Sequence, residues 1–152
     1  NILLGYGEYY GVRSLLELHH GSMNESCSGA YLIMQEFDPK LIGVIHDPQN
    51  MVISGRENWR MGLEILGDYL AYVHWKDSVF ARNAQGVWNF KLVHPGEGLV
   101  NWPQFVRALQ ETGFNGYLCN ENLMDKTRMA SEEYLEAELA YLKSLVSGCQ
   151  LT

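Results

Sequence analysis

Four short apolar runs, each closed by polar residues, recur along the chain. Each run holds seven to nine residues, with many β-branched, aromatic and aliphatic side chains. Runs of this length and composition are typical of strands that are buried within a sheet. The four runs are VRSLLELHH (residues 12–20), LIGVIHD (41–47), LAYVHWKD (70–77) and GYLCNEN (116–122). We therefore expect four buried strands with polar carboxyl-terminal ends.

Amphipathic helical patterns alternate with these runs, and the clearest covers residues 101–113. Asn101 is a candidate N-cap, Pro103 lies in the first turn and Gly113 provides the stop. Weaker patterns of the same kind cover residues 28–37 and 57–69.

The last helical pattern covers residues 131–148, between a candidate N-cap at Ser131 and a stop at Gly148. We expect it to bury a stripe of four apolar side chains, namely Leu135, Leu139, Leu142 and Val146. Strand and helix therefore alternate four times. Because parallel neighbours need a crossover of a dozen or more residues, this order predicts an α/β fold with a parallel sheet.

A segment with no helical pattern, residues 78–100, follows the third strand directly. It is long for a connection inside a compact domain, so we expect an irregular loop with a functional role. No linker interrupts the chain, and we treat residues 1–152 as one domain. The first residue is not methionine, so we also expect the natural chain to continue upstream.

Each expected strand carries an ionisable residue at its carboxyl end, and these residues are Glu17, Asp47, His74 and Glu121. In α/β folds the carboxyl ends of parallel strands meet at one rim, where such proteins build their sites. Three carboxylates and one imidazole at one rim suit a divalent cation that prefers oxygen ligands. We expect manganese, magnesium or cobalt, with zinc less favoured because thiolates are missing from the set.

Charge and cysteine content narrow the class of protein further. The formal net charge is −7 and no basic run exists to neutralise phosphates, which argues against a nucleic-acid partner. Three irregularly spaced cysteines (Cys27, Cys119 and Cys149) fit neither a disulfide framework nor a cysteine-rich zinc site. No stretch of 18 apolar residues and no signal-peptide pattern is present. We expect a cytoplasmic protein without a membrane partner.

The motifs LLELHHG, GVIHDPQN, YVHWKD, PGEG and GYLCNEN, in this order, resemble the strand-end motifs of the xylose isomerase-like TIM barrels, the sugar phosphate isomerase and epimerase group. The resemblance covers nearly the whole chain but only strands five to eight of that barrel. It implies that residues 1–152 form its C-terminal half. An N-terminal half-barrel or a second copy of the chain is then the expected partner.

The resemblance also assigns roles to individual residues. It places the metal ligands on Glu17, Asp47, His74 and Glu121, and the two catalytic carboxylates on Glu17 and Glu121. The sequence departs from many ketose epimerases of the family at two positions. Where those enzymes have a histidine three residues after the aspartate that corresponds to Asp47, this chain has Asn50. Where they have a proline directly after the glutamate that corresponds to Glu121, it has Asn122. Sugar specificity therefore does not transfer. We expect substrate contacts from three residues, namely His19, Asn50 and Lys76.

Several of these residues have a competing structural interpretation. His19 shares the face of Glu17 only if the strand continues, and a structural role is an equal alternative. Lys76 can bind a substrate oxygen or phosphate, or form a salt bridge with Asp77 or Glu97.

Other polar and aromatic residues are expected to be mainly structural. Period-two alternation puts His46 on the helix side of the sheet, as a hydrogen-bonded packing residue. His20 is expected to be structural, Asp77 to hold the following loop, and Glu97 to belong to a turn. The aromatic residues Trp75, Trp88 and Phe90 are expected in the core, with a sugar pocket as the alternative.

The function implied by the resemblance is proton transfer next to a carbonyl, in a metal-dependent sugar or sugar-phosphate isomerase or epimerase. An inosose-type dehydratase is the alternative within the same fold, because the same enediolate can expel hydroxide. A non-catalytic half-barrel that binds a sugar or assembles with a partner is the alternative from another class.

Overall fold

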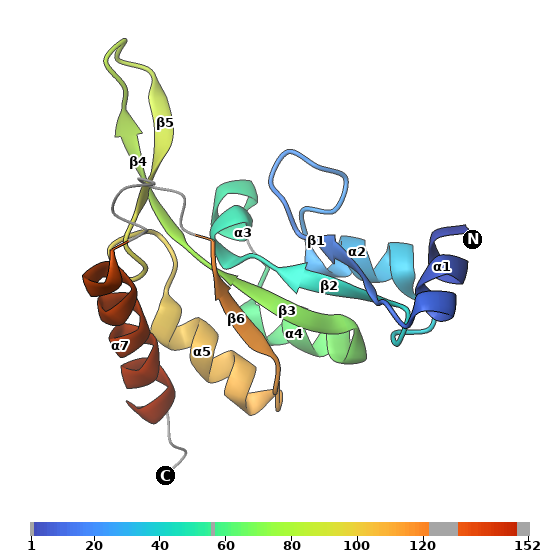
Figure 1. Ribbon diagram of the computed structural model, residues 1–152. Helices are drawn as coiled ribbons and strands as arrows, with labels where there is room; N and C mark the ends of the chain where they lie inside the picture. Colours follow the sequence, from blue (N-terminus) through green and yellow to red (C-terminus); the bar gives the residue numbers. More distant parts are fainter. Residues whose placement is uncertain (1, 56, 122–130, 149–152) are drawn as a thin grey trace.

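A four-stranded parallel sheet is the centre of the computed structural model, which describes residues 2–55, 57–121 and 131–148 (Figure 1). The strands pair in the order β1-β2-β3-β6. Their bounds are β1 Ser14–Glu17, β2 Ile42–His46, β3 Leu70–Trp75 and β6 Tyr117–Asn120. All four predicted strands and their parallel arrangement are confirmed, and each strand is shorter than its apolar run.

Helices cover one face of this sheet (Figure 1). They are α2 (Cys27–Met34), α4 (Trp59–Leu66), α5 (Trp102–Glu111) and α7 (Glu132–Gly148), and a short 3-10 turn, Gly67–Tyr69, follows α4. The helix-facing strand residues Val44, Val73 and Trp75 join the core that these helices close. The four predicted helices are therefore confirmed, with shifts of a few residues at their ends.

The predicted caps of α5 and α7 are also confirmed. The Asn101 side chain accepts a hydrogen bond from the Gln104 N–H at 3.1 Å, and the Ser131 hydroxyl accepts one from the Tyr134 N–H at 3.3 Å. Each cap satisfies an N–H that the first turn of a helix leaves without a partner.

The expected buried stripe of α7 is wrong for three of its four residues, whereas Leu142 is partly buried and packs against the core. Leu135, Leu139 and Val146 are each about half exposed, whereas Tyr134 and Glu138 are buried. The helix is apolar on two faces, so its leucines alone do not tell which face meets the core. Leu135 and Leu139 instead line a hollow beside Leu118 of β6.

The expectation of an irregular loop is also wrong for residues 78–93, whereas residues 94–100 contain no helix or strand, as expected. The functional role of this segment stays a prediction. Strands β4 (Asp77–Arg82) and β5 (Trp88–Val93) form an antiparallel hairpin that projects from the body of the fold (Figure 1). Asn83 accepts hydrogen bonds from the turn N–H groups, and Gly86 adopts a φ of 77°. An asparagine and a glycine between two β-rich runs are the sequence features that predict a hairpin.

Two helices have no counterpart in the sequence prediction: α1 (Ile2–Tyr10), beside β1, and α3 (Pro48–Ser54), directly after β2. Asp47 is the N-cap of α3 and Pro48 lies in its first turn. These two residues are a helix start signal, which the sequence prediction did not use because it assigned Asp47 to the end of the strand. None of the helices in the described ranges combines the length and apolar character needed to span a bilayer.

Candidate metal centre

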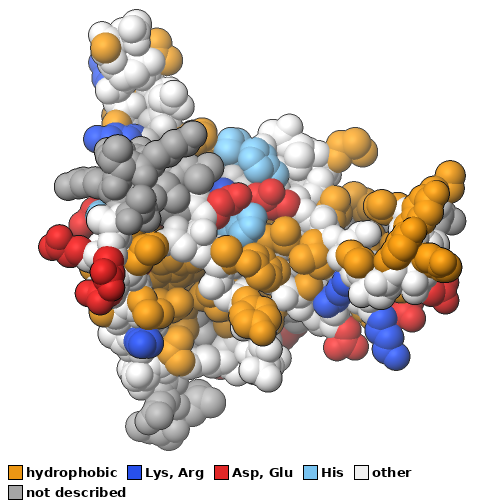
Figure 2. All heavy atoms as spheres, viewed as in Figure 1, with side chains coloured by type: hydrophobic (Ala, Val, Ile, Leu, Met, Phe, Trp, Pro, Cys, Tyr) orange, Lys and Arg blue, Asp and Glu red, His pale blue; other side chains and the backbone are white. Residues whose placement is uncertain are grey.

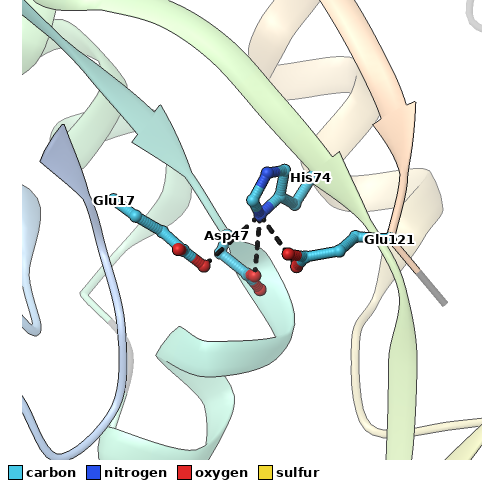
Figure 3. Close-up of side chains that lie close together, drawn as sticks. All are labelled: Glu17, Asp47, His74 and Glu121. Carbon is cyan, nitrogen blue, oxygen red and sulfur yellow. Dashed lines mark hydrogen bonds and ion pairs between the residues drawn. The ribbon is translucent and has the colours of Figure 1, made fainter. Parts of the chain in front are cut away.

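Four ionisable side chains meet at the carboxyl ends of the sheet, on the face away from the helices (Figure 3). His74 lies in the middle strand β3, and Asp47 directly follows the other middle strand, β2. Glu17 is the last residue of the outer strand β1, and Glu121 directly follows the other outer strand, β6. This placement follows from alternation, because His46 and Trp75, the sequence neighbours of Asp47 and His74, point to the core instead. Figure 2 shows acidic and histidine side chains gathered in the middle of this face.

The geometry of the four side chains suits one cation. The Nδ1 atom of His74 lies 3.4 Å from Glu17 Oε1, 3.3 Å from Asp47 Oδ2 and 3.0 Å from Glu121 Oε2. One ligand atom from each residue lies within 4.8 Å of the others. Ligands on opposite sides of a cation are about 4 to 5 Å apart, twice the metal–oxygen distance. Three carboxylates and one imidazole thus form a donor set that can hold a divalent metal.

Lys76 also enters this cluster. Its Nζ lies 2.7 Å from Asp47 Oδ2 and 2.6 Å from Glu121 Oε2, and the residue is only 9% exposed. From the sequence we considered a salt bridge from Lys76 to Asp77 or Glu97, and this prediction is wrong because the observed partners are Asp47 and Glu121. Because Lys76 and His74 are two residues apart on β3 and its extension, both side chains reach the same oxygens.

The cluster favours positive charge. Burial opposes ionisation of Asp47, but hydrogen bonds from His74 and Lys76 outweigh it, and the pKa of Asp47 lies below its usual value. Burial likewise disfavours the charged forms of His74 and Lys76. The carboxylates around them outweigh burial, so the pKa of each is raised. The same oxygens would stabilise a bound divalent cation.

Asn50 supports two of the carboxylates and is 1% exposed. Its main-chain N–H donates to Asp47 Oδ1 at 2.9 Å, and its amide donates to Glu17 Oε1 at 3.3 Å. Its side-chain oxygen accepts from His20 Nδ1 at 2.6 Å, and His20 packs edge-on against Phe90 of the hairpin. Protein groups thus contact both polar atoms of the amide, and a direct substrate contact by Asn50 stays a prediction.

The predicted structural role of Asp77 is confirmed. Its carboxylate is fully buried and accepts hydrogen bonds from four main-chain N–H groups, those of Ser78, Gly96, Gly98 and Val100, at 2.9 to 3.2 Å. A Cβ at Gly98 would lie 2.1 Å from Asp77 Oδ1, so glycine is required for this close approach. Asp77 therefore latches the PGEG turn onto the end of β3.

The histidines divide as follows. His46 packs against Phe105 and Trp59, as predicted, but its buried Nδ1 has no hydrogen-bond partner in the described part of the chain, so the expected hydrogen bond is wrong there. Strand β1 ends at Glu17, and the exposed His19 stacks on His20 at 4.6 Å, with its Nδ1 donating to the His20 carbonyl. A substrate contact by His19 remains a prediction.

The remaining predictions concern residues outside the cluster. Glu97 is exposed in its turn, and Trp75 is buried in the core as expected. The core expectation for Trp88 is wrong, because this residue is 62% exposed on the hairpin, where Arg82 lies over its ring. Phe90 is half-buried against His20. Asn122 lies outside the described residues.

One supporting residue was missed from the sequence. Glu138 of α7 is buried and accepts hydrogen bonds from Trp75 Nε1 at 2.7 Å and Asn120 Nδ2 at 3.2 Å. Trp75 and Asn120 lie opposite each other on the paired strands β3 and β6. Trp75 directly follows His74, and Asn120 directly precedes Glu121. Glu138 therefore ties α7 to the strand ends that carry the site. A glutamate on the buried side of an amphipathic helix was the available signal.

Comparison with known proteins decides the family. The sequence model of the family described as "Xylose isomerase-like TIM barrel" matches residues 1–145. The chain belongs to this family. The resemblance carried by the strand-end motifs is thereby confirmed, and the fold is similar to that of solved xylose isomerase-like proteins.

The relatives of this xylose isomerase-like chain, both in sequence and in structure, match nearly all of it but only about half of their own length. An inosose dehydratase from Mesomycoplasma hyopneumoniae (strain 7448) is 25% identical over 93% of this chain and 51% of its own length. A xylose isomerase-like protein from Mycobacterium smegmatis, solved with magnesium, superposes with a TM-score of 0.72 at 17% identity, over 98% of this chain and 49% of that one. The 3-keto-D-glucoside 4-epimerase of E. coli gives 0.65 at 18% identity, over 96% and 50%. The chain spans about half the length of these relatives.

Proposed function

We propose that this chain is the C-terminal half of the catalytic barrel of a metal-dependent isomerase or epimerase that acts on a sugar or sugar phosphate. The observation that carries the proposal is the convergence of Glu17, Asp47, His74 and Glu121 within 4.8 Å at the strand ends. Magnesium in the relative from M. smegmatis supports an oxygen-preferring divalent ion, with manganese and cobalt as the other candidates and zinc less favoured.

The proposed division of labour follows the order of the strands. A bound divalent ion would polarise the carbonyl and stabilise the negative charge that develops on its oxygen. Asp47 and His74, from the middle strands, would mainly hold the ion. Glu17 and Glu121, from the outer strands, lie on opposite sides of the cluster. One would remove the carbon-bound proton and the other would return a proton to the opposite face of the enediolate.

Substrate contacts are proposed for three neighbours of this centre. The exposed ring of His19 stands beside the strand end of Glu17, and Lys76 presents an ammonium group at the cluster. Asn50 lies between these carboxylates and His20. We propose that they bind hydroxyl or phosphate oxygens of the substrate.

A dehydratase is the second candidate function, supported by the curated inosose dehydratases that match more than 90% of this chain. Loss of a hydroxide from the same enediolate would need the same first proton transfer. The two functions therefore share the carboxylate that removes the carbon-bound proton. In the dehydratase the other carboxylate would give its proton to the departing hydroxyl group, which leaves as water, instead of to carbon.

We also propose that further strands complete the sheet at both edges. Within the described residues, β1 pairs only with β2 and β6 only with β3. Leu15 of β1 and Leu135 and Leu139 near β6 are exposed by 40% to 49%. Unpaired edges with apolar neighbours invite further strands. An N-terminal half of a longer chain, or a second chain, would supply them, in keeping with relatives of twice the length.

Hydrogen exchange tests the proposed chemistry. The assembled, metal-loaded enzyme, incubated with candidate ketoses and inososes in deuterated water, should place deuterium on the carbon next to the carbonyl. Glu17→Gln and Glu121→Gln should each lower turnover by about 10² or more, the usual effect of losing a positioned acid or base. Substrate affinity should change much less.

Two results would contradict this function. Turnover with complete retention of the carbon-bound hydrogen points to hydride transfer, and full activity of Glu121→Gln removes that residue from the reaction. Loss of one water from the product, with the label still exchanging, selects the dehydratase instead.

A further inference from the structure

The cluster contains a cation of its own. Lys76 Nζ forms ion pairs with Asp47 Oδ2 at 2.7 Å and Glu121 Oε2 at 2.6 Å. The lysine side chain is only 11% exposed, and the Asp47 side chain is fully buried. Because a buried charge is costly without a partner, this ammonium group is held in place by the two carboxylates.

The same two oxygens face the expected metal position. His74 Nδ1 lies 3.3 Å from Asp47 Oδ2 and 3.0 Å from Glu121 Oε2. Asp47 and Glu121 are therefore shared between the ammonium group and the position around which the four ligand atoms converge. In sites with two metal ions, carboxylates bridge ions roughly 3.5–4 Å apart in the same way. The Lys76 ammonium group contacts the two shared oxygens as the second ion of such a site would.

The formal charges lead to the same conclusion. Glu17, Asp47 and Glu121 contribute three negative charges, and Lys76 leaves a net charge of minus two with a neutral His74. One divalent cation neutralises this cluster completely. A second would add uncompensated positive charge next to an ammonium group in a partly buried site, where charges are poorly screened.

We propose that Lys76 occupies the second cation position of the centre and thereby limits it to a single divalent ion. This inference rests on the proposed metal-binding role of the four strand-end residues. Lys76 is in this sense a specificity-determining residue, since it sets the number of ions rather than ligating one. It also keeps Asp47 and Glu121 close together before an ion binds, by relieving the repulsion between their carboxylates.

Manganese binding to the intact protein tests the proposal without any substrate. Calorimetric titration gives the number of Mn²⁺ ions bound, and electron paramagnetic resonance shows whether two ions are spin-coupled neighbours. Wild type should bind one ion at the cluster. Lys76→Met should bind the first ion on the order of tenfold more tightly, because the cluster then carries one more net negative charge. It should also take up a second, spin-coupled ion.

Two controls isolate position from charge. Lys76→Arg keeps the positive charge and should bind one ion with affinity close to that of wild type. Lys91→Met removes the same charge from an exposed residue of β5 and should leave the stoichiometry at one. Lys76→Gln carries the same expectation as Lys76→Met if the methionine variant does not fold.

The outcomes separate this inference from the proposed function. If wild type binds one ion, and folded Lys76→Met or Lys76→Gln binds one ion with unchanged or weaker affinity, the role of Lys76 is refuted and the metal centre stands. A spin-coupled pair in wild type refutes it whatever the variants do. If wild type binds no ion at the cluster, the proposed metal-dependent function fails first, and this inference fails with it.

Discussion

Replacing Asp77 by asparagine should remove hydrogen bonds that hold the turn after the hairpin in place, and should thereby destabilise the protein. Oδ1 of this buried carboxylate accepts from the N–H groups of Ser78 and Val100, and Oδ2 accepts from those of Gly96 and Gly98. An amide keeps one acceptor oxygen and places an NH2 group where the other oxygen was. Asp77→Asn therefore leaves two main-chain donors facing a donor.

The magnitude follows from these two lost hydrogen bonds. A buried N–H without an acceptor costs about 1–3 kcal/mol, and the Gly96 and Gly98 groups are only partly buried. We therefore take about 1–2 kcal/mol for each and expect the free energy of unfolding to fall by about 2–4 kcal/mol. Urea titration of the metal-free protein at neutral pH measures this change, with an unchanged slope if the unfolded state is unaffected.

Glu97→Gln is the matched control, because it removes the same charge from an exposed position in the same turn. Surface changes of this kind alter stability by less than about 0.5 kcal/mol. A loss below about 1 kcal/mol for Asp77→Asn, or an equal loss for Glu97→Gln, would refute the latch. Weaker Mn²⁺ binding should accompany the destabilisation, since Asp77 directly follows the segment that carries His74 and Lys76.

Two further predictions concern residues beside the cluster. Asn50→Ala removes the side-chain amide that donates to Glu17 but keeps the main-chain N–H that donates to Asp47 at the start of α3. Mn²⁺ should therefore bind about tenfold more weakly in a calorimetric titration. Unchanged affinity contradicts the supporting role of Asn50. Burial lowers the pKa of His46 to about 4, against the opposing effect of Asp47 and Glu57. Because the unfolded pKa is about 6.5, stability should fall by up to about 3 kcal/mol as pH drops from 6.5 to 4. Urea titrations at several pH values measure this loss, and His46→Leu should lack this part of it; an identical pH dependence in both proteins counts against a buried neutral histidine.

The sheet and the four-residue cluster were predictable because both depend on local sequence. An apolar run predicts a buried strand, and the residue at its end lies at the rim whichever strands are neighbours. Glu17, Asp47, His74 and Glu121 could thus be selected without knowing any contact between them. Alternation correctly separated Asp47 from the packing residue His46.

The failures concern long-range packing. The partners of Lys76 depend on how strands distant in sequence bring Asp47 and Glu121 together, so a nearby acid such as Asp77 was the natural guess. The apolar faces of α7 could be ranked only from the position of β6, which leaves Leu135 and Leu139 exposed. The hairpin and α3 were missed for another reason, because local sequence signals for both were present. Gly86 indicates the turn of the hairpin, and Pro48 indicates the start of α3.

Anomalous diffraction from Mn²⁺-loaded crystals of the intact protein tests the central claim most directly. We expect one manganese peak at the carboxyl ends of the sheet, within about 2.0–2.6 Å of side-chain oxygens of Glu17, Asp47 and Glu121 and of His74 Nδ1. Crystals that bind manganese only elsewhere, or that leave these four side chains without a peak at saturating Mn²⁺, would contradict it.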